Sequence, residues 1–456
     1  MFKHAKAAAH TSAAVPDDAL EKLAAEVRIQ LASANPDAEA GAIGDHLEAA
    51  GEPISAVQWW KRSMRFEVRA GAPGQGVAAG LKMLDYLDSE SQDYADAAIA
   101  TGRLLLDMGE LTGAADVLEP LTSVVNADSA LRAGDVLADV YENAGLGSKW
   151  DRLIGSMTER EPAAGPAGLR ALYCARSMWL NSRGRRERGF AEAQKAVEIA
   201  RPGRGAQRAA QRLVYTCLSR GDLELGEEAA RKALEHAGAD SELKARSLRA
   251  LGVDLVWKQR GADAIVCFEE LLELVRRHGF LARLPIGWHD LGEALRVDGQ
   301  LNAARDAYET ALRTAKEMQL TSSVQLIQPK LLICDLLEGR TEGIQDKIRA
   351  FVPTAVASGL ALAEPFGYML SAWAYALDGD LTGAQAAYAG VADMRDMAID
   401  PQFPVIMEQT GEAFAQSKLE VPRQRAREAL ELAVEFWRRY GQTERSERCA
   451  ARLAAL

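Results

Sequence analysis

Apolar residues recur three and four positions apart along most of the chain, as the buried face of an amphipathic helix requires. In the stretch "WHDLGEALRVDGQLNAARDAYETALRTA" this spacing predicts two helices, at about 286–298 and 301–317. Gly299 lies between them and permits a tight turn, because glycine adopts backbone conformations that other residues avoid. The stretch is therefore predicted to fold as an antiparallel helix hairpin.

The order of large and small residues in this stretch suits two helices that cross closely. Gly292 and Ala304 are small where the backbones would touch, and Ala311 again keeps the contact close. Large side chains fill the space on either side of the crossing, namely Trp288, Leu291, Leu295 and Tyr308.

These residues resemble the tetratricopeptide repeat (TPR), whose pattern is W-x2-L-G-x2-Y, then A-x3-F, then A. Leu295 stands where the family usually has Tyr, and the Pro that ends the second helix is missing. The matching residues, in order, are Trp288, Leu291, Gly292, Leu295, Ala304, Tyr308 and Ala311.

The same pattern recurs in phase along the chain, with weaker copies around Gly145, Gly184 and Gly339. A series in phase predicts an all-α, right-handed superhelical solenoid of about nine to eleven TPR-like helix pairs. The clearer copies hold Ile43, Gly44, Leu47, Gly51, Ala56 and Trp60; Gly102, Leu105, Gly109, Ala114 and Leu118; Leu213, Cys217, Gly221, Gly226 and Ala230; Leu248, Leu251, Gly252, Leu255, Ala264 and Phe268; and Tyr368, Ala372, Tyr375, Gly379, Ala384 and Tyr388.

The turn glycines Gly221, Gly299, Gly339 and Gly379 lie near multiples of about 40 residues, not the 34 of the standard repeat. Each helix is therefore expected to carry close to one extra turn. This spacing resembles the long-helix TPR variety in the TPR region of bacterial regulatory and signalling ATPases. The sequence of His46–Trp60 is similar to the first repeat after the ATPase core of such proteins. The resemblance implies signalling, although the ATPase core itself is missing here.

The array is expected to be interrupted near 70–92, where "AGAPGQGVAAG" is rich in glycine and an irregular helix pair or a register break is predicted. The expected organisation is an N-terminal segment at 1–35, the TPR-like array at 36–400 and C-terminal capping helices at 401–456. The two ends are predicted to form helices at about 16–34, 422–440 and 442–455.

Composition and charge narrow the class of protein. Alanine is abundant and aromatic residues make up only 6%, which favours closely packed helices, and the net charge of −11 argues against a nucleic-acid partner. The start lacks the apolar core of a signal peptide, and no run approaches the ~18 apolar residues of a membrane span, so a cytoplasmic protein without a membrane partner is expected. The oligomeric state stays open.

The cysteines are odd in number and widely spaced, with no CxxC pair, so we expect free thiols that serve as small core residues. They are Cys174, Cys217, Cys267, Cys334 and Cys449.

Motifs of catalysis are absent from the sequence. There is no GxxxxGK[ST] phosphate loop, no HExxH, no GxSxG and no EF-hand loop, and the six histidines are scattered. We therefore expect a non-enzymatic protein without a cofactor or a metal site.

In the TPR family the first helix of each repeat lines a concave groove through its positions two, five, six and nine. The resemblance implies inward-facing residues in four copies: Arg208, Gln211, Arg212 and Tyr215; Arg246, Arg249, Ala250 and Val253; Ile286, His289, Asp290 and Glu293; and Phe366, Met369, Leu370 and Trp373. The candidates for binding a partner are Arg208, Gln211, Arg212, Tyr215, Arg246, Arg249, His289, Glu293, Met369 and Trp373.

These positions predict a basic groove in the middle of the chain and an apolar one near the C-terminus. Arginine forks suit carboxylates, so an acidic peptide segment or a chain terminus fits the basic part. The alternative is that the arginines pair with nearby acids such as Glu242 or Asp254.

The predicted function is an interaction scaffold that binds a protein or peptide in this groove, and the alternative is a sensing module that regulates a separate effector. A closed apolar pocket near Met369 and Trp373 would favour the sensor.

Three tryptophans outside this groove carry separate expectations. Trp60 takes a core position, and Trp59 either anchors an interface or packs on the N-terminal helix. Trp257 is expected to be exposed.

Overall fold

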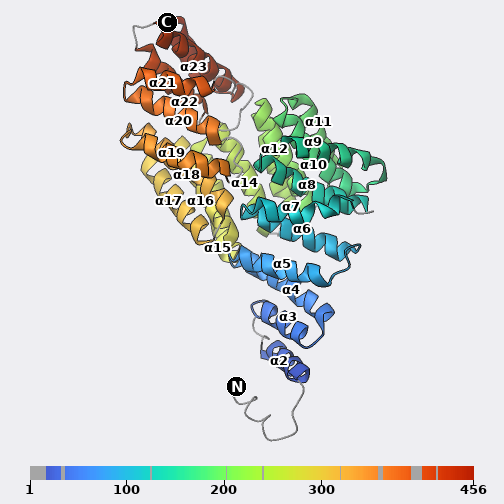
Figure 1. Ribbon diagram of the computed structural model, residues 1–456. Helices are drawn as coiled ribbons and strands as arrows, with labels where there is room; N and C mark the ends of the chain where they lie inside the picture. Colours follow the sequence, from blue (N-terminus) through green and yellow to red (C-terminus); the bar gives the residue numbers. More distant parts are fainter. Residues whose placement is uncertain are drawn as a thin grey trace.

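The computed structural model describes residues 17–31, 36–123, 126–201, 203–238, 241–318, 320–357, 363–391, 403–416 and 420–456. All regular elements in these ranges are helices (Figure 1). They are α2 (Asp17–Leu31), α3 (Ala40–Ala49), α4 (Pro53–Arg69), α5 (Pro73–Tyr86), α6 (Gln92–Asp107), α7 (Leu111–Leu118), α8 (Ala127–Asn143), α9 (Gly147–Glu159), α10 (Pro166–Ser182), α11 (Arg186–Glu198), α12 (Arg204–Arg220), α13 (Leu223–Ala237), α14 (Ser241–Trp257), α15 (Gly261–His278), α16 (Leu284–Val297), α17 (Leu301–Glu317), α18 (Thr321–Leu337), α19 (Ile344–Ala357), α20 (Ala363–Leu377), α21 (Leu381–Tyr388), α22 (Phe403–Ala415), α23 (Glu420–Arg439) and α24 (Thr443–Ala454), with short 3₁₀ turns η3 (Pro120–Ser123), η4 (Glu161–Ala163), η5 (Leu281–Arg283) and η6 (Ala389–Val391).

Helices next to each other in sequence pack against each other, which makes a solenoid of hairpins. Helix α3 pairs with α4, and from α6 onward each even-numbered helix pairs with the next helix, ending with α22 and α23. Helix α24 follows the last pair and packs against α23. The all-α solenoid is therefore confirmed, as are the helices expected at 286–298, 301–317 and at both ends of the chain. The boundary expected at residue 400 lies outside the described residues.

A glycine of the first helix faces a large side chain of the second helix in several hairpins. A Cβ atom built on Gly292 would lie 2.6 Å from the Tyr308 ring, and one on Gly252 would lie 2.5 Å from the Phe268 ring. Such distances are shorter than any ordinary van der Waals contact, so only glycine lets these helices approach so closely. The predicted role of small residues at the crossings is thus confirmed.

The turn between the two helices of a hairpin commonly has one residue in the left-handed region. Gly299 has a φ of +81° and Gly221 a φ of +83°, which favours glycine because a side chain would be strained there. In the turn between α14 and α15 the residue is Gln259, with a φ of +58°. The hairpin was nevertheless recognised in the sequence from Gly252, Ala264 and Phe268.

The glycine-rich region near 70–92 contains one regular helix, α5, rather than an irregular pair. Gly80 of α5 packs against Thr101 of α6. Gly102, also in α6, packs against Leu118 of α7. Helix α6 therefore serves both as the second helix for α5 and as the first helix for α7. One extra helix shifts the phase of the repeat, which is the predicted register break.

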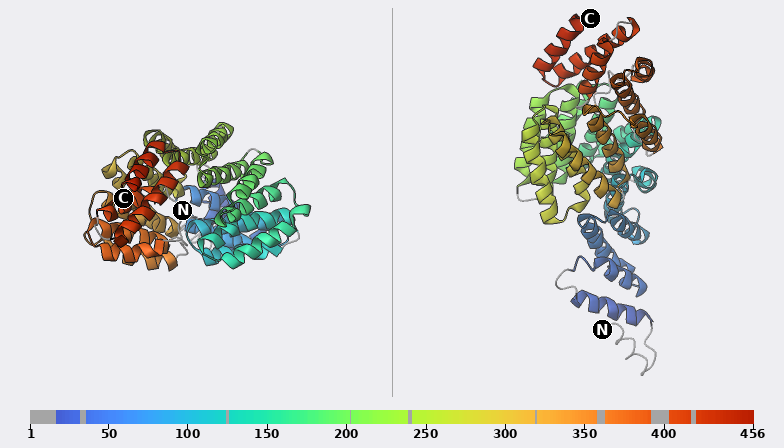
Figure 2. Two further views of the ribbon diagram at one scale, coloured as in Figure 1. Left: turned by 90° about the horizontal axis from the view of Figure 1, so that it is seen from above. Right: turned by 90° about the vertical axis from the view of Figure 1, so that its left-hand side faces the viewer.

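The chain coils so that residues far apart in sequence meet. The N-terminal helices α2–α5 extend from one end of the body, and the C-terminal helices form the other end (Figures 1 and 2). The C-terminal helices contact the middle of the chain: the Gln442 Nε2 atom, between α23 and α24, donates a hydrogen bond of 3.0 Å to the carbonyl oxygen of Lys258, directly after α14. The Tyr440 ring lies 4.8 Å from the Trp257 ring, edge to face. We call this the inter-turn contact; it joins α14 to α23 and α24.

Two of the three tryptophan expectations are decided by packing. Trp60 is fully buried, as predicted, whereas Trp257 is buried and not exposed, because Tyr440 of the inter-turn contact covers it. Trp59 is half-buried against the N-terminal cluster that contains Ala25 of α2, with the Arg62 guanidinium 4.8 Å above its ring. This arrangement agrees with packing near the N-terminal helix.

All five cysteines are free and buried, as expected of small core residues. No helix in the described ranges is both long and apolar enough to span a membrane.

Replacing Gly292 by alanine should destabilise the protein by roughly 1–3 kcal/mol, because the new methyl group overlaps the buried Tyr308 ring. Thermal unfolding measures the effect. The matched control is Gly155→Ala in α9, where no atom lies within 4 Å of the added Cβ. That control should gain about 0.5–1 kcal/mol, since alanine favours helix more than glycine does. Equal melting temperatures for the two variants would contradict the close-contact role of Gly292.

Candidate binding groove

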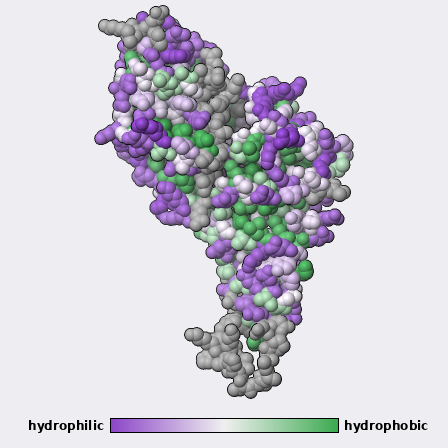
Figure 3. Space-filling model, in the orientation of Figure 1, coloured by the Kyte–Doolittle hydropathy of each residue, from purple (hydrophilic) through white to green (hydrophobic). Residues whose placement is uncertain are grey.

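The first helices of successive hairpins form one continuous inner row, in which each contacts the next. In order, these helices are α6, α8, α10, α12, α14, α16, α18, α20 and α22. Contacts between successive second helices are sparser. The first helices therefore lie at the smaller radius of the coil. We call the surface they expose toward the coil axis the groove. On the face shown in Figure 3, hydrophilic residues cover the outer edges and hydrophobic residues gather in the middle of the body.

Two predicted arginines of α12 reach across α10 to carboxylates of α8. Arg208 Nη2 donates to Asp135 Oδ1 at 2.8 Å and to Asp139 Oδ2 at 2.9 Å. Arg212 pairs with Asp139 as well. The buried Cys174 of α10 lies beside this cluster, and burial raises the pKa of its thiol to about 12. These contacts link three consecutive repeats.

The charges of this cluster act strongly on one another. Burial alone would raise the pKa of the Asp139 carboxyl, but the Arg208 and Arg212 guanidinium groups outweigh it and lower this pKa to about 2. Asp139 is therefore ionised throughout the physiological pH range.

A second cluster joins α14, α16 and α18. Arg249 Nε donates to Asp290 Oδ2 at 2.6 Å, and His289 Nδ1 lies 2.9 Å from Asp290 Oδ1. Glu293 Oε1 accepts a hydrogen bond of 2.6 Å from the Tyr308 hydroxyl. The same oxygen lies 3.4 Å from Lys330 Nζ. The neighbouring cations, Lys330 first, outweigh burial and lower the pKa of Glu293. His289 and Glu293 are thus held in a buried network and are not free groove side chains.

Arg208, Arg212 and Arg249 pair with acids of other repeats, and Asp254 is not among their partners. The side chain of Glu242, the other acid that the sequence suggested, lies outside what the structure describes. Asp254 is fully buried, and its carboxyl oxygens have no hydrogen-bond partner among the described residues. Burial raises its pKa to about 7, although Lys258 Nζ lies 4.0 Å away. The side chains of Arg208, Arg212 and Arg249 remain 15%, 16% and 24% exposed. Each therefore keeps part of its surface at the groove.

The other candidates divide into accessible and inaccessible side chains. Tyr215 is 40% exposed, and Gln211 and Arg246 are partly buried. Met369 and Trp373 of α20 are fully buried, because α18 and α22 pack on both sides of this helix. Their side chains offer no surface to a partner, so the expected apolar groove is not lined by these two residues.

Sequence reasoning missed Arg103, Asp135 and Asp139, which belong to the same groove. Arg103 follows Gly102, and Asp135 follows Gly134, just as Glu293 follows Gly292. Arg103, Asp135 and Glu293 occupy the ninth, inward-facing position of their repeats, whereas Asp139 lies one helical turn after Asp135 and is not covered by this rule. The rule applied to the clearer repeats would have identified Arg103 and Asp135 in α6 and α8 as well.

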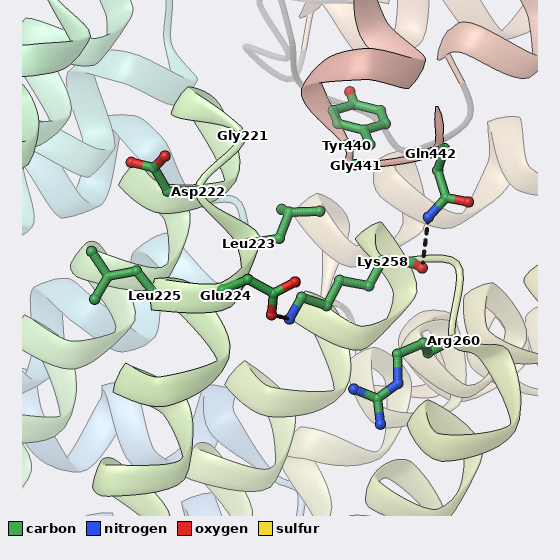
Figure 4. Close-up of a pocket in the computed structure, with 10 residues that line it drawn as sticks. All are labelled: Gly221, Asp222, Leu223, Glu224, Leu225, Lys258, Arg260, Tyr440, Gly441 and Gln442. Atoms are coloured by element: carbon green, nitrogen blue, oxygen red, sulfur yellow. Dashed lines mark hydrogen bonds and ion pairs between the residues drawn. The ribbon is translucent and has the colours of Figure 1, made fainter. Parts of the chain in front are cut away.

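A cavity of about 690 Å³ lies at the inter-turn contact, outside the groove (Figure 4). It is lined by the turns after α12 and α14 and by Tyr440, Gly441 and Gln442. The Lys258 ammonium is already neutralised by Glu224 and by Glu227, whose Oε2 atom lies 2.6 Å away. No group of three His, Cys, Asp or Glu side chains in the described ranges is arranged to hold a metal ion.

Comparisons with known proteins agree with the fold. The crystal structure of a Rap protein complexed with competence and sporulation factor matches with a TM-score of 0.51, at 13% identity, over 87% of this chain and 99% of that one. The Cut9–Hcn1 hetero-tetramer of APC/C has a TM-score of 0.47, at 11% identity, over 94% of this chain and 93% of that one. The human IFIT1 dimer with PPP-AAAA also has a TM-score of 0.47, at 10% identity, over 97% and 95% of the two chains.

The match to the Rap protein shows that this chain has the fold of TPR-type helical repeat proteins. No protein-family model and no curated protein matches the chain.

Replacing Asp139 by asparagine should destabilise the protein by roughly 2–4 kcal/mol at pH 7, because Arg212 and Arg208 lose a buried partner. The folded-state pKa is lowered, so this stabilisation is present above pH 4 and is lost as the pH falls toward 2. Chemical denaturation at pH 7 and pH 3 measures it. Asp346→Asn, which breaks an exposed pair with Arg349, should cost under about 0.5 kcal/mol. If the free energies of unfolding of wild type and Asp139→Asn differ no more at pH 7 than at pH 3, the stabilising role of the ionised Asp139 is refuted.

Replacing Asp254 by asparagine should have the opposite pH dependence. The folded-state pKa of about 7 lies above the unfolded value, so the wild type loses stability as the pH rises from 4 through 7. Asparagine does not ionise, and the variant should melt roughly 1–3 °C above wild type at pH 8 and close to it at pH 5. Differential scanning calorimetry at both pH values gives the answer. A variant that melts lower at pH 8 than at pH 5, relative to wild type, would show that Asp254 is not a buried neutral acid.

Proposed function

We propose that the protein is a non-enzymatic interaction scaffold that binds a protein or peptide segment in the groove, in bacterial signalling or complex assembly. The observation that carries the proposal is the placing of Arg208, Arg212 and Arg249 on two consecutive inner helices. Aspartates hold these side chains in position, and part of each remains accessible. A side chain that is already ordered loses little entropy when a partner binds.

The groove favours a partner with an acidic segment. Guanidinium groups present two parallel donors that match the two oxygens of a carboxylate. A nucleic acid suits the surface poorly, because the chain has a net charge of −11 and aspartates alternate with the arginines. The solved Rap structure is a complex with competence and sporulation factor, which supports a TPR-type solenoid as a fold suited to such a partner.

The proposal is tested by Gln211→Glu together with Tyr215→Glu, two groove positions of α12. Tyr215 is hydrogen-bonded to Arg249, so the second change also places a carboxylate beside that guanidinium. The added charges should repel an acidic segment and weaken binding by about tenfold or more. Heptapeptide pools rich in Asp and Glu, retained on the immobilised full chain and quantified by mass spectrometry, provide the readout. Arg313→Glu on the outer helix α17, with a side chain 65% exposed, is the matched control. If wild type retains no peptide, or if all three proteins retain the same peptides equally, the groove is not the binding surface.

A second candidate, a ligand- or peptide-sensing module that controls a separate effector, is favoured by the inter-turn contact. This contact ties the groove helix α14 to α23 and α24, almost 200 residues later. A Cβ atom on Gly221 would lie 2.3 Å from the Arg439 carbonyl oxygen, so at this point the two turns of the coil are in direct backbone contact beside the cavity. A ligand that changes the pitch of the coil would break or tighten this contact.

In the sensing module, Gly221→Ala should open the coil and shift it toward a longer form. Small-angle X-ray scattering should show a larger radius of gyration for this variant than for wild type. Gly299→Ala is the control, because it also has a positive φ but no atom within 4 Å of the added Cβ. Equal radii of gyration for the Gly221→Ala and Gly299→Ala proteins would contradict a role of the inter-turn contact in opening the coil.

A further inference from the structure

The turn between α10 and α11 carries four arginines at the edge of the solenoid, outside the groove. They are Arg183, Arg185, Arg186 and Arg188. Arg183 Nη2 lies 2.7 Å from Asp151 Oδ1. The side chains of the other three are exposed or half-buried and make no ion pair or hydrogen bond with the described part of the chain. We call Arg185, Arg186 and Arg188 the turn arginines.

The acids around the turn arginines already have other partners. Glu187 lies between the turn arginines in sequence, and its Oε1 atom is 3.2 Å from Arg220 Nε. The Nη2 atom of Arg220 is also 3.1 Å from Asp222 Oδ2. Glu192, on the next turn of α11, is bound by two other cations. None of these carboxylates is therefore left to pair with a turn arginine.

The charges at this turn leave an excess of two positive charges. Five come from the turn arginines together with Arg183 and Arg220. Three negative charges oppose them, on Asp151, Glu187 and Asp222. This excess lies in a chain with a net charge of −11, so it does not follow from the average composition.

Cations at other hairpin turns are bound within the fold. At the turn between α14 and α15, Arg260 Nη2 lies 2.6 Å from Asp263 Oδ2. At the turn between α18 and α19, Arg340 Nη2 lies 3.2 Å from Asp335 Oδ1. These cations have a structural partner in the free protein. The turn arginines have none, so their charge is available to a ligand from outside.

We propose that the turn arginines bind a phosphorylated side chain of a partner protein. Together with Gly184 and Glu187 they line one cavity of about 450 Å³, so a single group can reach all three guanidinium groups. A phosphomonoester has nearly two negative charges and three acceptor oxygens. It therefore matches both the excess charge and the number of donors, whereas a carboxylate supplies only one charge. The site lies on the edge formed by the turn and goes beyond the function proposed for the groove.

The surroundings favour one phosphate group over an extended polyanion. A nucleic acid or an anionic membrane would reach past the cavity to the carboxylates of Asp151, Asp222 and Glu187, the last of which is 81% exposed. The Phe190 ring offers no free face for a base to stack on, because the Arg220 guanidinium lies 4.1 Å above it.

A protein partner fits this cavity better than a small phosphate compound. The walls come from one turn of the chain, Gly184 to Arg188, and hold no apolar side chain. Sites for small molecules are mostly apolar and enclose their ligand. Residues that flank a phosphorylated side chain would supply the remaining contacts beside the turn.

The test compares the full wild-type chain with the double variant Arg185→Gln/Arg188→Gln. Neither arginine makes an ion pair in the fold, so this variant should melt close to the wild-type temperature. The matched control, Arg313→Gln/Arg349→Gln, removes the same charge from two exposed arginines on other helices. The probes are fluorescent heptapeptide pools with a central phosphoserine, Glu or Ser, measured by anisotropy. Inorganic phosphate, single-stranded RNA and vesicles that contain phosphatidic acid compete with them.

Wild type and the control should bind the phosphoserine pool at least about tenfold more tightly than the Glu and Ser pools, and the double variant should lose this preference. Equal binding of the phosphoserine pool by wild type and the double variant overturns the site, as does the absence of a preference in wild type. Inorganic phosphate, RNA or vesicles that bind wild type more tightly than the phosphoserine pool does would overturn the protein partner. The groove variant Gln211→Glu/Tyr215→Glu should bind this pool like wild type, so failure of the two proposals is distinguishable.

Discussion

The close crossing of two helices, with a glycine of one against a large side chain of the other, is the contact on which this solenoid depends. Gly292 on Tyr308 and Gly252 on Phe268 bring the hairpin partners within a distance that no side chain on the first helix would allow. Each hairpin buries only part of its apolar surface, and the next hairpin covers the rest. The same geometry turns the first helices inward, so the stacking that stabilises the fold also creates the groove.

Charge in the groove has two roles that the contacts separate. The pairs between Arg208 and Asp135 and between Arg249 and Asp290 connect inner helices of different repeats and hold the curvature of the coil. The exposed parts of Arg208, Arg212 and Arg249 are the donors that the proposed function assigns to a partner.

The inter-turn contact limits how far the coil opens. Trp257 and Tyr440 pack edge to face, and the Gly221 turn lies against the Arg439 backbone. Both turns belong to hairpins that are distant in sequence. The coil is closed in its middle part, and the end of α4 contacts η5, so the helices that extend beyond the coil are α2 and α3 (Figure 1).

The sequence by itself determined the local structure: the helices, their pairing and the crossing glycines, because these depend on residues within one repeat of each other. It also placed Arg208, Arg212 and Arg249 on the inner helices, since the inward positions follow from helical periodicity. The turn at Gln259 lacks the glycine signal, but Gly252, Ala264 and Phe268 identified its hairpin all the same.

Only the tertiary structure decided which charges meet. Arg208 pairs with an aspartate more than seventy residues away, and Trp257 is covered by a residue almost two hundred positions later. Trp373 is buried by the helices on both sides of α20. The curvature and pitch of the coil set these distances, and they arise from small rotations summed over many hairpins, which no single repeat contains.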